Sequence, residues 1–147
     1  MLADTGPDDA VLARVLDFLP TITTPEGGVP FVLETVADAP RAPWWNTDPD
    51  PPATLNPTAS ITGLLYKFGV TYPWLKTATG YVWAQLEVLR DSDLHTLLSV
   101  LMFLEAVPER ERAERTLERL ADEILRHTTL ETDAEGYPSC AANTTRC

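Results

Sequence analysis

The chain has 147 residues, of which 44% are hydrophobic and 22% charged, a balance typical of one globular domain and not of a disordered segment. Twenty-two acidic residues against eleven basic ones give a net charge of −11, which opposes binding to nucleic acid or to an anionic membrane surface. The acidic N-terminus lacks the pattern of a secretory signal, and no apolar run is long enough to span a bilayer, so a cytoplasmic location is expected.

The N-terminal third of the chain predicts one helix followed by a long loop. Apolar residues recur at helical spacing from Pro7, a residue suited to a first turn, and the pattern stops at Pro20. A turn-rich segment with two glycines follows over residues 24–31. From Val32 to Leu55 the density of prolines excludes regular helix, so this stretch is predicted to be mostly loop.

Two further helices are predicted in the middle of the chain. The first has Asn56 as its N-cap and Pro57 at its first position, and it ends at Gly69. The next begins near Pro73 and continues to about Leu89, with apolar residues at a spacing of 3.6. The predicted apolar face of the first consists of Ile61, Leu64, Leu65 and Phe68.

The last two predicted helices differ in their hydrophobic patterns. One is capped by Ser92 or Asp93, runs to about Val107 and is apolar nearly all round, so it should be buried. The other begins at Pro108, is highly charged and carries a single apolar stripe, so it should lie on the surface. Because the connections are short, neighbouring helices should be antiparallel, and the alternation suggests two layers of helices. The sequence therefore predicts an all-α domain over residues 1–138.

Both cysteines, Cys140 and Cys147, fall in a predicted loose tail over residues 139–147, where free thiols are expected. His127 and Cys140 lack the spacing of paired zinc ligands, so neither a metal site nor a cofactor is predicted.

An ordered set of segments resembles uncharacterised bacterial proteins related to the prenyltransferase and squalene-cyclase repeat superfamily. The resemblance implies antiparallel helical hairpins that form part of an α/α toroid, with a central cavity for an apolar ligand. Members of that group are about twice as long, so an incomplete ring or a fragment is expected, with apolar edges that favour self-association. The segments are Glu26–Phe31, Ala42–Trp45, Asn56–Leu65, Tyr72–Leu75 and Gly136–Pro138.

Three functions are compatible with this sequence. In the first, the protein binds an apolar, isoprenoid-like ligand, with or without catalysis, against Trp44, Trp45 and Tyr66, because aromatic faces suit such ligands. In the second, a non-enzymatic helical module binds another protein through an apolar face. In the third, paired carboxylates on a similar toroid hydrolyse a glycoside.

Candidate catalytic residues are few, and whether the protein is an enzyme is left open. Asp48 and Asp50 match only part of the Asp-x-Asp-Asp motif of squalene-type cyclases, and a solvated loop is the favoured interpretation. His95 follows Asp93 by two positions and could act as a general base oriented by that carboxylate. The favoured interpretation of His95 is a contact at a helix end.

Overall fold

The computed structural model describes residues 8–47, 49–90 and 92–133, with the side chains of residues 127–133 excepted. This part of the chain contains no strand, only an isolated antiparallel bridge between Pro30 and Ala53. The all-α class predicted from the sequence is confirmed. The five helices are α1 (Asp9–Phe18), α2 (Leu55–Lys67), α3 (Pro73–Val88), α4 (Leu94–Ala106) and α5 (Arg110–Asp133).

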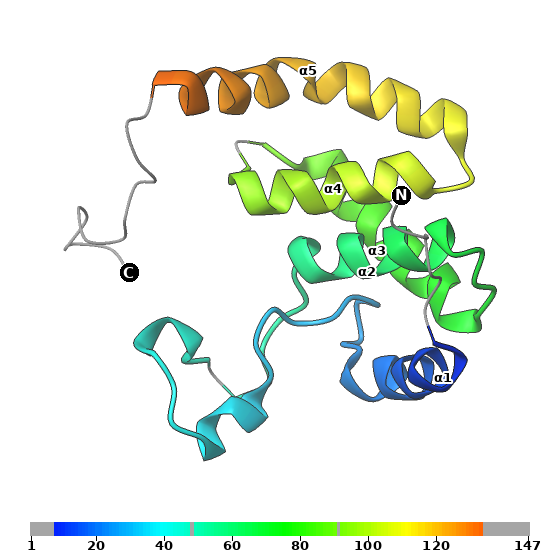
Figure 1. Cartoon of the computed structure of the whole chain (residues 1–147), viewed down its shortest axis with the longest axis vertical. Coiled ribbons are helices and arrows are strands. Elements are labelled where there is room, and N and C mark those ends of the chain that lie inside the picture. Colours follow the sequence, from blue (N-terminus) through cyan, green and yellow to red (C-terminus); the bar gives the residue numbers. More distant parts are fainter. Residues whose placement is uncertain (1–7, 48, 91, 134–147) are drawn as a thin grey trace.

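The last four helices form two antiparallel hairpins, α2–α3 and α4–α5 (Figure 1). In the first hairpin, Leu65 at the end of α2 shares a hydrophobic cluster with Trp74 at the start of α3. In the second, Glu123, late in α5, accepts a hydrogen bond from the backbone N–H of Ser92, which precedes α4. Asn56 near the start of α2 contacts Ser99, and Gly63 further along α2 contacts Met102 further along α4, so the two helices run in the same direction, side by side.

The contact between α2 and α4 is unusually close. A Cβ placed on Gly63 would lie 2.6 Å from the carbonyl oxygen of Met102, so the two backbones meet at that point. The neighbouring positions carry small or hydroxyl-bearing side chains, and Thr58, Ala59 and Thr62 are fully buried. The hydroxyl of Thr62 donates to the Thr58 carbonyl within the helix at 2.6 Å, so it is buried without an unsatisfied proton.

This contact corrects the apolar face predicted for α2. Leu65 is buried as expected, and Ile61 is partly buried against the same cluster. Leu64 and Phe68 are instead 40% and 43% exposed. The buried face is rotated toward the small residues because only they permit the backbone of α4 to approach so closely.

One predicted helix boundary and one predicted burial pattern also change. The N-cap of α2 is Thr54, not Asn56, because the N–H of Thr54 donates to the carbonyl of Val29 and holds the residue in extended geometry. The predicted stop at Pro20 is confirmed, because α1 ends at Phe18 and only a short 3₁₀ turn follows over Leu19–Ile22. Helix α4 is not buried all round, because Leu98 is 50% exposed.

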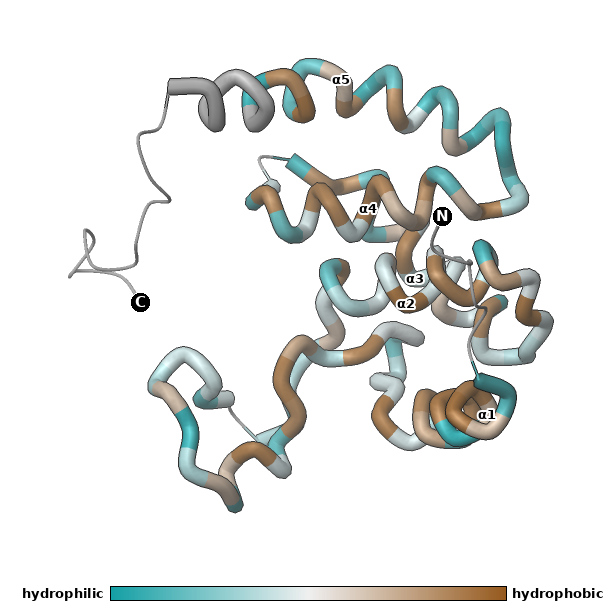
Figure 2. Tube along the Cα trace, in the orientation of Figure 1, coloured by the Kyte–Doolittle hydropathy of each residue, from teal (hydrophilic) through white to brown (hydrophobic). Residues whose placement is uncertain are grey.

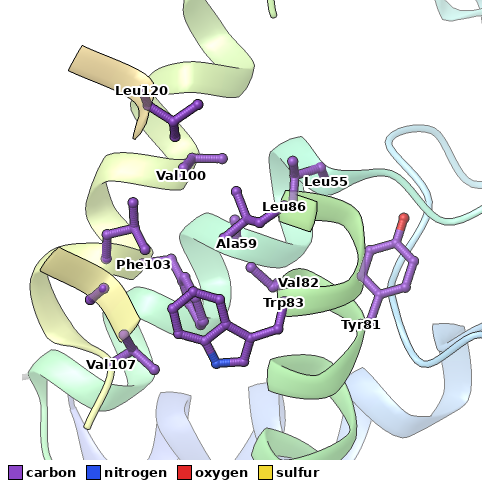
Figure 3. Packing of buried hydrophobic residues seen from close by; sticks show 12 residues of the cluster. Leu55, Ala59, Tyr81, Val82, Trp83, Leu86, Val100, Phe103, Val107 and Leu120 are labelled. Atoms are coloured by element: carbon purple, nitrogen blue, oxygen red, sulfur yellow. The ribbon is translucent and has the colours of Figure 1, made fainter. Parts of the chain in front are cut away.

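The main core lies where all four of these helices meet (Figure 3). Trp83 of α3 packs edge-on against Phe103 of α4, with ring centroids 5.0 Å apart. Trp74 is also buried, and its indole N–H donates to the hydroxyl of Thr23 at 2.7 Å. These two tryptophans therefore fill the core between helices.

Helix α5 covers α4 as a surface layer, in agreement with its predicted amphipathic pattern. Figure 2 shows α5 as mainly hydrophilic with regular hydrophobic intervals, whereas α4 is hydrophobic along most of its length. Ala113 and Leu120 face the core, and Glu111 and Arg115 form an exposed i,i+4 ion pair at 3.8 Å. Arg112 adds a cation–π contact, with its guanidinium 4.3 Å from the centre of the Trp83 ring.

The predicted loop is attached to the helices at both ends. In the turn-rich segment just before the loop, Gly27 adopts φ +95° in a tight turn against Thr77 of α3, a conformation that favours glycine. The bridge between Pro30 and Ala53 then closes residues 31–52 into one excursion. Within it, short 3₁₀ turns occupy Glu34–Asp38 and Pro43–Trp45, and this excursion lies beside the helices in Figure 1.

Several predictions fall outside the described residues or stay open. The tail with Cys140 and Cys147 lies outside them, as do residues 1–7, so the domain boundary at residue 138 stays a prediction. The toroid arrangement likewise stays a prediction. Within the described ranges, none of the helices combines the length and the apolar character needed to cross a membrane.

The contact at Gly63 can be tested with a pair of glycine substitutions. Gly63→Ala should destabilise the protein by about 1–3 kcal/mol, because the added methyl group meets backbone that cannot rotate away. Gly80→Ala is the matched control in α3, where an added Cβ meets nothing within 4 Å, and it should stabilise by about 0.5–1 kcal/mol. Urea denaturation of both variants measures the difference, and equal effects would contradict the close approach of the helices.

Candidate functional site

A groove of about 730 Å³ opens where the N-terminal ends of α2 and α4 meet the start of the loop. We call it the α2–α4 groove. Figure 1 shows that both helices begin on the side of the molecule that carries the loop. The residues that line it are the apolar Phe31, Leu98 and Met102 and the polar Thr54, Asn56, Asp93, His95, Thr96 and Ser99.

The apolar wall of the groove comes from α4 and the loop. Leu98 and Met102 are one helical turn apart on the same face of α4, and both are exposed. Phe31 lies at the loop side and stacks on Trp45, with ring centroids 5.9 Å apart and an interplanar angle of 2°. Stacked rings and aliphatic side chains are the typical lining of a site for apolar molecules.

The structure separates the two adjacent tryptophans. Trp45 is 40% exposed and supports Phe31, so it lies next to the α2–α4 groove without lining it. Trp44 is 70% exposed and takes no part in that stack. The turn that carries them is held by Arg41, whose Nε donates to Oδ1 of Asn46 at 2.8 Å.

The polar rim of the groove is centred on Asp93, the N-cap of α4. Its Oδ1 accepts hydrogen bonds from the N–H groups of His95 and Thr96 at 2.9 and 3.0 Å, and its Oδ2 accepts one from the Thr96 hydroxyl at 2.6 Å. Burial acts to raise the pKa of Asp93, but these hydrogen bonds and the charge of His95 together hold the pKa below its ordinary value. The carboxylate is therefore ionised at neutral pH.

His95 lies at the same rim. Its Nδ1 is 3.9 Å from Oδ1 of Asp93, which is beyond hydrogen-bonding distance, and the side chains of both residues are largely exposed. Asp93 uses its carboxylate to cap the helix, so it does not orient the imidazole as a catalytic carboxylate would. The prediction that His95 serves at a helix end agrees with this position, and its catalytic role stays untested.

A hydrogen bond joins α2 to α4 beneath the groove. The hydroxyl of Ser99 lies 3.1 Å from Oδ1 of Asn56 and 3.0 Å from the carbonyl oxygen of His95. Thr54 Oγ1 is shielded from solvent and has no hydrogen-bond partner among the described residues. The floor of the groove thus combines hydroxyl groups with amide oxygens.

The remaining predicted site residues lie elsewhere. Tyr66 lines a separate cavity of about 400 Å³ next to α3, and its hydroxyl is 2.8 Å from the hydroxyl of Thr79. The structure therefore does not bring Tyr66 together with Trp45 at the α2–α4 groove. Asp50 is exposed in the loop with φ 59°, and Asp48 lies outside the described residues.

Sequence reasoning did not identify Phe31, Leu98 or Met102 as site residues. Leu98 and Met102 belong to a helix that is apolar nearly all round, and such a pattern predicts burial of every face. The sequence alone does not indicate which faces the neighbouring helices cover. The glycine at position 63 signals a close approach of another helix to α2, but it does not indicate which side chains of α4 stay exposed.

Within residues 8–47, 49–90 and 92–133, no cluster of three or more His, Cys, Asp and Glu side chains could hold a metal ion. Comparison with known proteins found no matching family model, no matching curated protein and no matching solved structure.

The capping role of Asp93 predicts a pH-dependent effect on stability. Asp93→Ala should cost about 1 kcal/mol at pH 7, because two backbone N–H groups lose their acceptor. Since the pKa of Asp93 is lower in the folded protein, the contribution of its charge to the free energy of unfolding is complete above the ordinary aspartate value of about 3.8. This contribution is lost as the pH falls through the pKa of Asp93 in the folded protein. The stability difference between Asp93→Ala and the wild type should therefore shrink in acid.

Thermal unfolding at pH 7 and in acid measures this difference, which should be about 2–4 °C at pH 7. Asp93→Asn is the control, because asparagine caps a helix as well as aspartate and does not titrate. An unchanged melting temperature for Asp93→Ala at pH 7 would contradict the capping role.

Proposed function

We propose that the protein binds an apolar, isoprenoid-like molecule in the α2–α4 groove. The observation that carries the proposal is the pair of exposed apolar residues on α4, Leu98 and Met102, facing a hollow of about 730 Å³. Soluble proteins rarely leave side chains of this kind in a concave surface without a binding partner. The stacked rings of Phe31 and Trp45 extend the same apolar surface onto the loop.

The arrangement of the hairpins supports this proposal. Two parallel helices, α2 and α4, stand side by side, and each is followed by an antiparallel partner. This is the local geometry expected if the chain is part of an α/α toroid, in which an inner layer of parallel helices faces a central cavity. The resemblance to prenyltransferase-like repeat proteins implies the same ligand class, and we include the toroid in the proposal.

The test uses farnesol as the probe and the tryptophan fluorescence of the protein as the signal. In a Trp44→Phe background, Trp45 is the exposed indole next to the groove, since Trp74 and Trp83 are buried. Farnesol should change the emission in a saturable manner. Leu98→Gln should weaken the apparent affinity about tenfold, because it places an amide in the apolar wall.

Two further variants make this test specific. Val11→Gln is the matched control, because Val11 is similarly exposed but lies on α1, outside the groove. Trp45→Ala should weaken farnesol binding severalfold while the helical circular dichroism signal is retained. Because this variant lacks the reporting indole, its binding is measured by calorimetry. Failure of farnesol to bind at all, or an equal loss with Val11→Gln, would overturn the proposal.

A second candidate function, a protein-interaction module, is favoured by the outer stripe of α1. Val11, Val15 and Phe18 are all exposed along one side of this helix, whereas Leu12 and Leu16 pack inward. Together with neighbouring residues they line a shallow hollow of about 660 Å³. An apolar stripe of this kind suits a contact between two copies of the chain.

Sedimentation velocity over a range of micromolar concentrations tests this second candidate. The wild type should show concentration-dependent dimers, and Val15→Glu should abolish them, because each dimer would bury the added charges. Leu98→Glu is the control at the other exposed apolar site and should leave dimers intact. A wild type that stays monomeric at every concentration would contradict this candidate.

A further inference from the structure

The lining of the α2–α4 groove restricts the head group of the proposed ligand. Among the nine lining residues that the structure describes, none is Lys or Arg, and Asp93 contributes a carboxylate. Of these nine, only His95 has a side chain that can become positive, and its Nδ1 lies 3.9 Å from that carboxylate, which offsets its charge. A phosphate or diphosphate group placed here would meet a negative charge without the basic residues that normally bind it.

Two helix N-termini meet at the groove, and helix N-termini attract anions. In this structure, the attraction is reduced at both N-termini. At α4, Asp93 already occupies the position of an anion by accepting the N–H groups of His95 and Thr96. At α2, the first turn contains Pro57, which has no N–H to offer.

The rim and floor instead offer hydrogen-bond acceptors. The carboxylate of Asp93 has about four lone-pair positions, of which three accept the hydrogen bonds from His95 and Thr96. One position on Oδ2 stays available on an exposed side chain. Oδ1 of Asn56 competes with the His95 carbonyl for the single proton of the Ser99 hydroxyl, so it too can accept a hydrogen bond from a ligand.

From these observations we infer that the α2–α4 groove takes an uncharged apolar alcohol, whose hydroxyl donates to Asp93, and discriminates against the corresponding diphosphate. This inference rests on the proposed function and specifies its ligand class. The hydrocarbon chain lies against Leu98 and Met102, and the hydroxyl group lies at the rim. No covalent step is involved.

The experiment compares three molecules with the same farnesyl chain, measured by calorimetry with the full chain. Farnesol should bind at least tenfold more tightly than farnesyl diphosphate, with or without magnesium ions. It should also bind severalfold more tightly than farnesyl methyl ether, which has no proton to donate. Asp93→Asn keeps the helix cap but removes the charge, so it should reduce the preference for farnesol over the diphosphate at least threefold.

Asp17→Asn is the matched control, because it makes the same change in net charge on α1, away from the groove. It should leave the preference unchanged, and a matching reduction with both variants would show that only the overall charge of the protein matters. Diphosphate binding as tightly as farnesol, or the ether binding as tightly as the alcohol, would overturn the inference while leaving an apolar site in place. Absence of binding by all three molecules would overturn the proposed function as well.

Discussion

The close contact between α2 and α4 is the constraint on which the rest of the structure depends. Because the backbone of α4 passes directly over Gly63, the buried surface of α2 consists of small and hydroxyl-bearing residues. Larger side chains of both helices, such as Leu55 and Phe103, share the main buried cluster. Leu98 and Met102 are exposed on α4, where they line the groove. Hydrophobic burial is recovered on the other side, where α3 and α5 enclose Phe103 and Trp83.

The five α-helices of the described residues were predictable from the sequence, because capping residues and 3.6-residue periodicity are local signals. Asp93 was one of the two caps predicted for α4, and the surface position of α5 followed from its single apolar stripe. The face that α2 buries was not predictable, since Thr58 and Thr62 hide their hydroxyls by bonding within the helix, which no local pattern announces. Which face of α2 is buried depends on how closely it packs against α4. This tertiary contact overrides the face that the apolar residues of α2 would predict.

The candidate site was predictable only in part. Trp45 lies beside the α2–α4 groove, and His95 lies at its rim. Trp44 is exposed to solvent, and Tyr66 lines another cavity. Residues adjacent in sequence were expected to act together, yet a 3₁₀ turn directs the two indoles to different surroundings. Phe31 was not predicted as a site residue because its stacking partner, Trp45, lies fourteen residues further along the chain. A contact of this kind inside a loop leaves no periodic pattern in the sequence.

The bridge between Pro30 and Ala53 has a consequence for how this protein can change during evolution. It fastens both ends of the excursion over residues 31–52 to the helices, with Val29 held further by the hydroxyl of Thr58. The entropy of closing such a loop grows slowly, by about 0.6 kcal/mol for each doubling of its length. Insertions, deletions or wholesale exchange of this segment should thus be tolerated by the helices. If the protein binds a ligand as proposed, its preference can diverge among descendants through changes in the loop, while the packing of α2 on α4 is inherited unchanged.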